Sequence, residues 1–328
     1  MKVSGFRTEA SRVMDEIKAL FKAASTDYNR LRPHADSTLA LLVSAHGKLA
    51  REAELTEYGQ YAGRPAVTYS AFFVGRETSR PVRGDLYIAA PAEFAAKFRT
   101  LREALRLGPA TWEDAEKSLA NAVVYTSVMA VACAYDLWQR GSRKTPGTTF
   151  EIIMAALFQE MLPDAVFSKH IALTELLHDG DVDAAAEEEV DPAPVEDGDG
   201  PGSVSTDLVI RRTNDANTGV VLPLKITTRE RIVQPFAHQR ILDSAFGPNR
   251  YSSLLVCISE TQLDDKTKTV KQVCVPGTVK LFQKYLAPLG GLYYCDVPQR
   301  YAAPDMQRVV PVRSLGDLFG DVADLLAR

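Results

Sequence analysis

A β-hairpin signal in the second half of the chain is the feature that most limits the fold. Two runs rich in apolar and β-branched residues, STDLVIRR (205–212) and VVLPLKIT (220–227), enclose the turn-forming stretch NDANTG (214–219). Strand-forming runs on either side of Asn, Asp and Gly predict two antiparallel, paired strands. We therefore expect a β-sheet in this half of the chain.

The segments around the hairpin alternate between helix and strand patterns. A basic loop, GSRKTPG (141–147), leads into an apolar helix with Glu151 near its start. The other expected elements are a strand at 166–173, a helix within 229–246, a strand at 251–259, a helix near 278–286, a strand near 292–296 and a helix at 315–327. This order indicates an α/β or α+β fold, in which helices flank a mixed β-sheet.

The first third of the chain is predominantly helical in pattern. Apolar residues recur at helical intervals, which predicts helices at 6–24, 37–58, 91–107 and 111–140. The segment 63–84 mixes β-prone residues with turn formers and is expected to form short strands or a loop. We therefore divide the chain into a helical N-terminal region, residues 1–110, and a core, residues 111–328.

An acidic insert at about residues 178–203 hides the charge of the rest of the chain. The insert holds ten acidic residues and no Lys or Arg. The net charge is −4, but without these ten residues 32 acidic residues face 38 basic ones, a net charge of +6. We expect the insert to be a mobile loop because it cannot bury apolar surface, with a DNA-mimicking plug over a basic cleft as the alternative. The mildly basic remainder is open to nucleic acid as a partner.

The cysteines and the hydropathy pattern bear on the compartment. Cys133, Cys257, Cys274 and Cys295 are scattered without a CxxC pair. This spacing predicts buried, reduced thiols in a cytoplasmic protein rather than a zinc site or a disulfide framework. The sequence has no uncharged apolar run of about 18 residues and no signal-peptide core, so we expect no membrane span.

Three charged residues near the hairpin can form a hydrolytic site. Asp207 lies near the start of the first strand and Lys225 near the end of the second, so the hairpin can place them side by side. Glu151 on the preceding helix can reach the same edge of the sheet. Two carboxylates can hold one or two Mg²⁺ ions, which activate a water and neutralise a phosphate, while a lysine steadies the attacking hydroxide. This set is suited to phosphodiester hydrolysis.

In their order along the chain, these residues resemble the core of the PD-(D/E)XK nuclease superfamily, over roughly 146–246. The resemblance is greatest to its Type II restriction endonucleases that recognise CCGG and CCNGG sites. Glu151, Asp207 and Lys225 match the helix glutamate, strand aspartate and catalytic lysine of that branch. The residues that match the stretch after the lysine are Thr227, Thr228, Arg229, Glu230, Arg231 and Gln234. The resemblance implies a restriction-endonuclease-like mixed sheet flanked by helices, and an Arg-Glu-Arg triplet that reads G·C pairs in the major groove.

The sequence departs from the family pattern at several positions. Pro223 stands where an acid two residues before the lysine is common, and Thr206 precedes the aspartate instead of proline. The branch can supply a glutamate thirteen residues after the lysine, but here that position is His238, followed by Gln239. Either residue can point at the metal site, yet neither is a carboxylate. These departures leave open a DNA-binding protein that has lost catalysis.

Each candidate residue also has a structural interpretation. Lys225 can be an ordinary lysine at a sheet edge, Asp207 can cap a turn, and Glu151 can be a first-turn glutamate favoured by the helix dipole. The triplet can be a solvated helix start. Arg143 and Lys144 in the basic loop suit phosphate contacts, although such loops are common.

Together these features predict a Mg²⁺-dependent, sequence-specific restriction endonuclease that cuts double-stranded DNA at a G/C-containing site, with Mn²⁺ able to substitute. A palindromic site would favour a homodimer, and the N-terminal region would serve dimerisation or DNA contact. A cognate methyltransferase acting on the same site is a possible partner. The competing hypotheses are a less specific repair or defence nuclease, an inactive DNA-binding protein of the same fold, and a helical interaction protein.

Overall fold

The computed structural model describes residues 4–61, 64–139, 141–142, 144–173, 202–215, 217–264, 266–267 and 269–327. Within these ranges it does not describe the side chains of residues 4–12, 60–61, 64–66, 229 and 230. The acidic insert and Arg143 therefore lie outside the described residues, apart from residues 202 and 203 at the end of the insert.

A seven-stranded mixed sheet forms the centre of the fold, in the order β12-β11-β8-β6-β5-β4, with β7 also pairing with β8. The strands are β4 (Ala165–Ala172), β5 (Ser203–Arg212), β6 (Gly219–Leu222), β7 (Leu224–Lys225), β8 (Tyr251–Ser259), β11 (Gly291–Asp296) and β12 (Val312–Ser314). The pairs β4–β5 and β5–β6 are antiparallel, whereas β8 pairs in parallel with β6, β7 and β11, and β11 with β12. The predicted hairpin and mixed sheet are confirmed.

The second hairpin strand is interrupted at Pro223. The sequence predicts one strand over 220–227, but β6 ends at Leu222 and β7 begins at Leu224. Proline has no N–H to donate to a strand ladder, so a break here is expected on chemical grounds. The carbonyl of Pro223 still accepts a hydrogen bond from Val256 N at 3.0 Å, which keeps the chain beside β8 up to Lys225.

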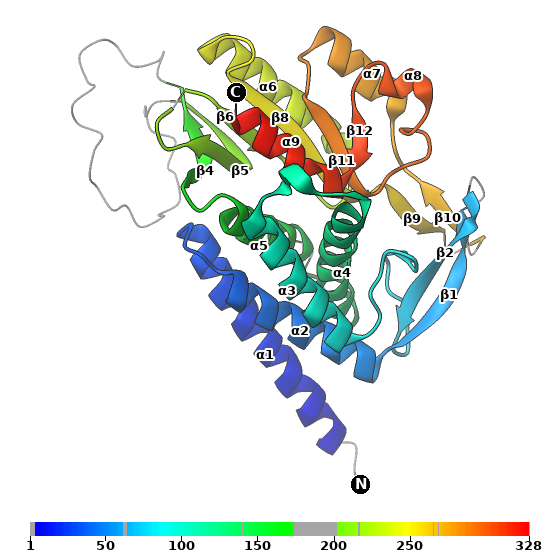
Figure 1. Ribbon diagram of the computed structural model, residues 1–328. Coiled ribbons are helices and arrows are strands. Elements are labelled where there is room, and N and C mark those ends of the chain that lie inside the picture. The colour runs from blue at the N-terminus through cyan, green and yellow to red at the C-terminus, as the bar shows by residue number, and fades with distance from the viewer. Residues whose placement is uncertain are drawn as a thin grey trace.

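Helices cover both faces of the central sheet (Figure 1). On one face lie α4 (Asp114–Trp138), α5 (Thr145–Met161) and α9 (Leu315–Ala327), with α1 (Ser4–Asn29), α2 (Ala35–Glu52), η1 (Pro109–Thr111) and α3 (Pro91–Leu107) packed outside them. The other face carries η3 (Arg229–Ile232), α6 (Val233–Phe246) and α7 (Pro276–Tyr285), with α8 (Pro304–Gln307) nearby. Alternate residues of β8 point to the two sides: Val256 joins the first core and Leu255 the second.

The N-terminal helices share a single hydrophobic core with the sheet. Leu41 of α2, Phe98 of α3, Val128 of α4 and Leu222 of β6 belong to one buried cluster and are fully buried. Within the described residues, α4 is one helix long and apolar enough to cross a membrane, but 83% of its most apolar 18-residue stretch is buried inside the protein. Its apolar composition is thus accounted for by packing on all sides.

A second, five-stranded sheet joins distant parts of the chain, in the order β3-β2-β1-β10-β9. It contains β1 (Glu54–Tyr61), β2 (Arg64–Phe73), β3 (Val82–Arg83), β9 (Thr261–Asp264) and β10 (Thr269–Gln272). The predicted helix over 37–58 is wrong at its end, because the chain becomes extended at Ala53 and enters β1. The antiparallel partner β2 gives this segment, which contains β-prone Thr56 and Tyr58, a full strand ladder.

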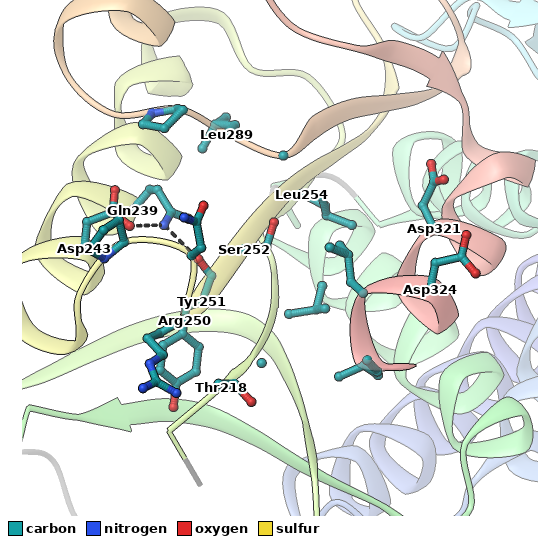
Figure 2. A pocket seen from close by; sticks show the side chains of 18 of the residues that line it. Thr218, Gln239, Asp243, Arg250, Tyr251, Ser252, Leu254, Leu289, Asp321 and Asp324 are labelled. Atoms are coloured by element: carbon teal, nitrogen blue, oxygen red, sulfur yellow. Dashed lines mark hydrogen bonds between the residues drawn. The ribbon is translucent and has the colours of Figure 1, made fainter. Parts of the chain in front are cut away.

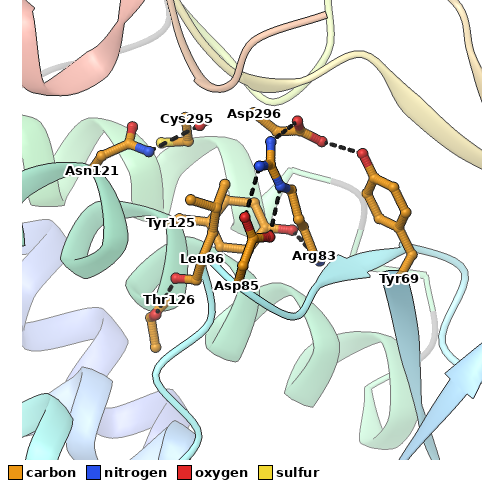
Figure 3. A network of polar contacts seen from close by, with 9 residues as sticks. All are labelled: Tyr69, Arg83, Asp85, Leu86, Asn121, Tyr125, Thr126, Cys295 and Asp296. Carbon is orange, nitrogen blue, oxygen red and sulfur yellow. Dashed lines mark hydrogen bonds and ion pairs between the residues drawn. The ribbon is translucent and has the colours of Figure 1, made fainter. Parts of the chain in front are cut away.

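A buried polar network ties the second sheet to the first (Figure 3). Asp296, at the end of β11, is 1% exposed. Its carboxylate accepts hydrogen bonds from Arg83 Nη1 and from the Tyr69 hydroxyl, both at 2.7 Å. Arg83 also donates to Asp85 at the surface. The network therefore fixes β2 and β3 against the carboxyl end of the central sheet.

Candidate active site

A slip in the pairing of β4 with β5 sets the position of Asp207. Ser168 pairs with Val209 and His170 pairs with Ser205, so three residues of β5, 206–208, lie opposite the single residue Lys169. Such a bulge disrupts the regular alternation of side chains and is often used to redirect one of them. Asp207 is the middle residue of this bulge, and its side chain is 20% exposed.

Lys225 meets Asp207 across the hairpin. The Lys225 ammonium donates to Asp207 Oδ2 at 2.8 Å, and the backbone N–H of Leu224 donates to the same oxygen at 2.7 Å. The pairing of Leu208 with Leu222 supplies the register that brings the two residues together. The Lys225 side chain is 17% exposed, so the ion pair is sheltered but reachable.

Glu151 approaches the same place from α5. The helix begins at Thr145, so Glu151 lies in its second turn and not in the first turn, which has no acidic residue. Glu151 Oε2 accepts a hydrogen bond from the Tyr28 hydroxyl at 3.1 Å. Burial, followed by the negative charge of Asp207, raises the pKa of the Glu151 carboxyl to about 7. The first-turn interpretation of Glu151 is therefore wrong, and the residue is one of two interacting carboxylates.

Two residues that the sequence did not indicate complete the surroundings. Tyr28, near the end of α1, contacts the main-chain carbonyl of Asp207 as well as Glu151. Lys169 has its ammonium 3.5 Å from the centre of the Tyr28 ring. Burial lowers the pKa of Lys169, against the opposing effect of Glu151 and Asp207. A lysine in the middle of a predicted strand was the one available signal, and nothing local marked Tyr28.

The two carboxylates fit a hard divalent cation. Asp207 Oδ1 and Glu151 Oε1 make no hydrogen bond within the described part of the chain. Among those residues no group of three or more His, Cys, Asp or Glu side chains is arranged to hold a metal ion. Mg²⁺ commonly binds through one or two carboxylates and takes its other ligands from water and substrate phosphate. The donor set suits Mg²⁺ or Mn²⁺ in the presence of a phosphate.

A small cavity of about 240 Å³ opens beside the ion pair, and we call it the Asp207 pocket. Its lining residues are Ser205, Thr206, Asp207, Pro223, Lys225, Gln234 and His238. Burial, and next the charge of Lys225, lower the pKa of the His238 imidazole, so this side chain is neutral at pH 7. His238 thus faces the ion pair as a neutral hydrogen-bonding group.

Gln239 lies away from this pocket. Its amide donates to the carbonyl of Tyr251 at 2.9 Å and to Asp243 at 2.8 Å (Figure 2), and it accepts from Ser253 N at 2.8 Å. The expectation that Gln239 can point at the metal site is therefore wrong, because its side chain binds the start of β8. Gln239 lines a larger cavity of about 830 Å³, which contains neither Asp207 nor Lys225.

The predicted DNA-binding residues follow the ion pair along the chain. Arg231 and Gln234 are exposed, at the end of η3 and the start of α6. Arg229 and Glu230 are in η3, with side chains outside the described set. The backbone N–H of Thr228, just before the triplet, is held by the buried Glu260 carboxylate at 3.0 Å.

Lys144, the other described candidate, is exposed immediately before α5. The four cysteines are buried and free, as expected. Burial raises the pKa of Cys133 to about 12, so this thiol is not a ready nucleophile.

Comparison of the chain with known proteins identifies the family to which it belongs. No protein-family model matches the chain, and no curated protein matches it significantly. Among solved structures, that of the Type IIP restriction endonuclease Kpn2I is 44% identical in sequence, covers 95% of this chain and 98% of that chain, and has a TM-score of 0.82. A complex of the restriction endonuclease PspGI with substrate DNA is 13% identical, covers 72% of this chain and 91% of that chain, and has a TM-score of 0.41. On the likeness to Kpn2I over nearly the whole of both chains, this protein belongs to the Type II restriction endonuclease family of enzymes.

Proposed function

We propose that the protein is a Mg²⁺-dependent endonuclease that hydrolyses phosphodiester bonds in double-stranded DNA at a specific, G/C-containing site. The observation that carries the proposal is the proximity of Asp207, Lys225 and Glu151, which the Asp207–Lys225 ion pair and the contacts of Tyr28 with Asp207 and Glu151 bring together. Membership of a restriction endonuclease family supports the substrate class. A mildly basic chain, once the acidic insert is set aside, agrees with a DNA partner.

The protein groups have separate tasks in this reaction. Asp207 and Glu151 would hold one or two divalent ions through their carboxylate oxygens, and Mn²⁺ would be able to replace Mg²⁺. A bound ion supplies an acidic water and neutralises charge on the phosphate. Lys225 has donor hydrogens beyond the one directed at Asp207, so its ammonium can orient the water or stabilise a phosphoryl oxygen. His238, neutral beside this pair, can accept a hydrogen bond from a water in the Asp207 pocket.

Sequence recognition is assigned to the segment after the lysine. Arginine can donate two hydrogen bonds to guanine, and glutamate can accept one from the cytosine amino group. Arg229, Glu230 and Arg231 are therefore proposed to read G·C pairs, with Gln234 beside them, as in the CCGG and CCNGG branch. Lys144 and Arg143 would bind phosphates and add no base preference.

The assembly and setting follow from the same activity. A palindromic site calls for two active sites related by a two-fold axis, so we propose a homodimer. We also propose that the protein acts in the cytoplasm. The region 1–110 would contribute dimer or DNA contacts, and the core would run from 111 to 328. A methyltransferase that modifies the same site is the partner that would protect the host DNA.

Digestion of several DNA substrates with Mg²⁺, followed by sequencing of the ends, tests the proposal. The wild type should give discrete bands with one common end sequence, whereas Asp207→Ala should give none. Asp264→Ala is a matched control, because it removes the aspartate of a remote Asp–Lys pair, to Lys271 at 3.1 Å. A smear would indicate a nuclease without sequence preference. Binding without cleavage by the wild type in either Mg²⁺ or Mn²⁺ would contradict the proposed reaction.

A further inference from the structure

Tyr28 links the N-terminal helices to both carboxylate residues of the site. Its hydroxyl lies 2.7 Å from the main-chain oxygen of Asp207 and 3.1 Å from Glu151 Oε2. The side chain is only 1% exposed. These partners are 179 and 123 residues away along the chain. Such a contact is a product of tertiary packing and not of local sequence.

We propose that Tyr28 is a positioning residue that holds the two carboxylates in the arrangement that a divalent cation requires. This inference rests on the proposed function, in which Asp207 and Glu151 are the metal ligands. The hydroxyl engages Glu151 through Oε2 and Asp207 through its main chain, so it leaves Oε1 and Oδ1 available to a cation. In this proposal Tyr28 acts through Asp207 and Glu151 and is not itself a metal ligand.

The Tyr28 hydroxyl lies where the β-bulge leaves a backbone carbonyl without a partner in the strand ladder. The slip in the pairing of β4 with β5 interrupts the strand ladder at residues 206–208. A backbone carbonyl in such a bulge needs a donor from outside the ladder, because a buried carbonyl without one is costly. Tyr28 supplies that donor, sharing its single hydroxyl hydrogen between Asp207 O at 2.7 Å and Glu151 Oε2 at 3.1 Å. The same contact restrains the backbone from which the Asp207 carboxylate projects.

Tyr28 is itself held firmly in place. The Lys169 ammonium lies 3.5 Å from the centre of the tyrosine ring and also donates to Asn29 Oδ1 at 2.7 Å. A cation at this distance over an aromatic face is an attractive contact. Lys169 is the residue opposite the bulge, so the ring is clamped between α1 and the strand that faces Asp207.

The connection between α1 and α2 is also anchored to α5, the helix that carries Glu151. His34 is buried, and its Nε2 lies 2.9 Å from the carbonyl of Ile152, the residue after Glu151. Gln159 of α5 donates to the carbonyl of Leu31 at 3.0 Å. Besides the hydrogen bond of Tyr28 itself, two contacts therefore hold the chain just after α1 against α5, the helix of Glu151.

Metal binding by Tyr28→Phe tests the inference. This change removes one oxygen and keeps the ring and its packing. Tyr293→Phe is a matched control, because Tyr293 is 2% exposed and its hydroxyl donates at 2.6 Å to a carboxylate, that of Asp321, outside the site. Calorimetric titration of the DNA-free protein with Mn²⁺ should give about tenfold weaker binding for Tyr28→Phe, as expected for loss of a hydrogen bond to a charged group. Tyr293→Phe should bind Mn²⁺ as the wild type does.

Cleavage kinetics give a second readout that a purely structural role would not change. Tyr28→Phe should need about ten times more Mg²⁺ for half-maximal cleavage and should approach the wild-type rate at saturating Mg²⁺. Denaturation curves of all variants show whether each is folded at the assay temperature.

Different results would contradict the positioning role of Tyr28 and the proposed function. If Tyr28→Phe matches Tyr293→Phe in both Mn²⁺ affinity and Mg²⁺ dependence, the positioning role is wrong, while the proposed function stands. If the wild type cuts DNA but Asp207→Ala and Lys225→Ala cut it equally well, the proposed site is wrong and Tyr28 loses its role with it. Loss of the maximal rate alone, with unchanged Mn²⁺ affinity, would also overturn the inference.

Discussion

Replacing Glu151 with glutamine should make the metal-free protein more stable while removing its ability to bind the cation. The structure keeps this carboxyl largely buried and close to Asp207, which raises its pKa from an ordinary 4.5 to about 7. Each pKa unit corresponds to about 1.4 kcal/mol, so the ionised form costs the folded protein about 3 kcal/mol. Glutamine is uncharged and nearly the same size, so it avoids this cost and can still accept a hydrogen bond from Tyr28.

The sign of the pH dependence follows from the raised pKa of Glu151. Below its ordinary value the carboxyl is protonated in both the folded and the unfolded state, and no penalty arises. As the pH rises toward 7, the unfolded chain releases the proton first, so the free energy of unfolding falls. Above about pH 7 both states are ionised and the full penalty is present. The advantage of Glu151→Gln should therefore be small near pH 5 and largest near pH 8.

Urea denaturation in EDTA at about pH 5.5 and about pH 8 measures this difference. Glu103→Gln, which changes an exposed glutamate on α3, is the matched control and should show no pH-dependent difference from the wild type. Added Mg²⁺ or Mn²⁺ should stabilise the wild type and not Glu151→Gln. The reasoning would be refuted if the difference in unfolding free energy between Glu151→Gln and the wild type were the same at both pH values. It would also be refuted if Glu151→Gln were less stable than the wild type at pH 8.

Three further outcomes follow from the geometry. Lys225→Ala should lower the rate of DNA cleavage by about 100-fold or more, with DNA binding in Ca²⁺ retained; full activity in a gel assay would exclude Lys225 from the reaction. Arg231→Ala should weaken binding to the cognate duplex by about 1–3 kcal/mol and lower the preference for it over other sequences, as measured by competition binding; an equal loss on all sequences would indicate a phosphate contact instead. Asp296→Ala should lower the free energy of unfolding by about 3 kcal/mol, because it removes the buried carboxylate that accepts hydrogen bonds from Arg83 and Tyr69; an unchanged urea midpoint would contradict this.

The part of the site that lies within the hairpin was predictable because its geometry is local. Once STDLVIRR and VVLPLKIT pair across their turn, the register brings Asp207 and Lys225 together, and the structure has them in contact at 2.8 Å. The bulge at 206–208 was not predictable, since it depends on how β4 meets β5 across the acidic insert. No sequence pattern indicated Tyr28 as a site residue, because a tyrosine near a helix end is common and only folding brings this one to the sheet.

The fold was predictable where each element carried its own pattern. The order of helices and strands after residue 141 is confirmed in its main elements, whereas β9 and β10 were not expected. The second sheet escaped prediction because β1 pairs with β10 through Tyr61 and Val270, which are far apart along the chain. Residues 54–58 form a strand because β2 gives them an antiparallel ladder, and this pairing overrode their helical pattern.

The position of a bound divalent cation tests the central claim most directly. Crystals of the protein with DNA and Mn²⁺ would give the cation through its anomalous scattering. We predict a peak within about 2.2 Å of carboxylate oxygens of both Asp207 and Glu151, and next to a DNA phosphate. A peak that touches neither carboxylate, or a DNA duplex bound at a surface remote from the Asp207 pocket, would contradict it.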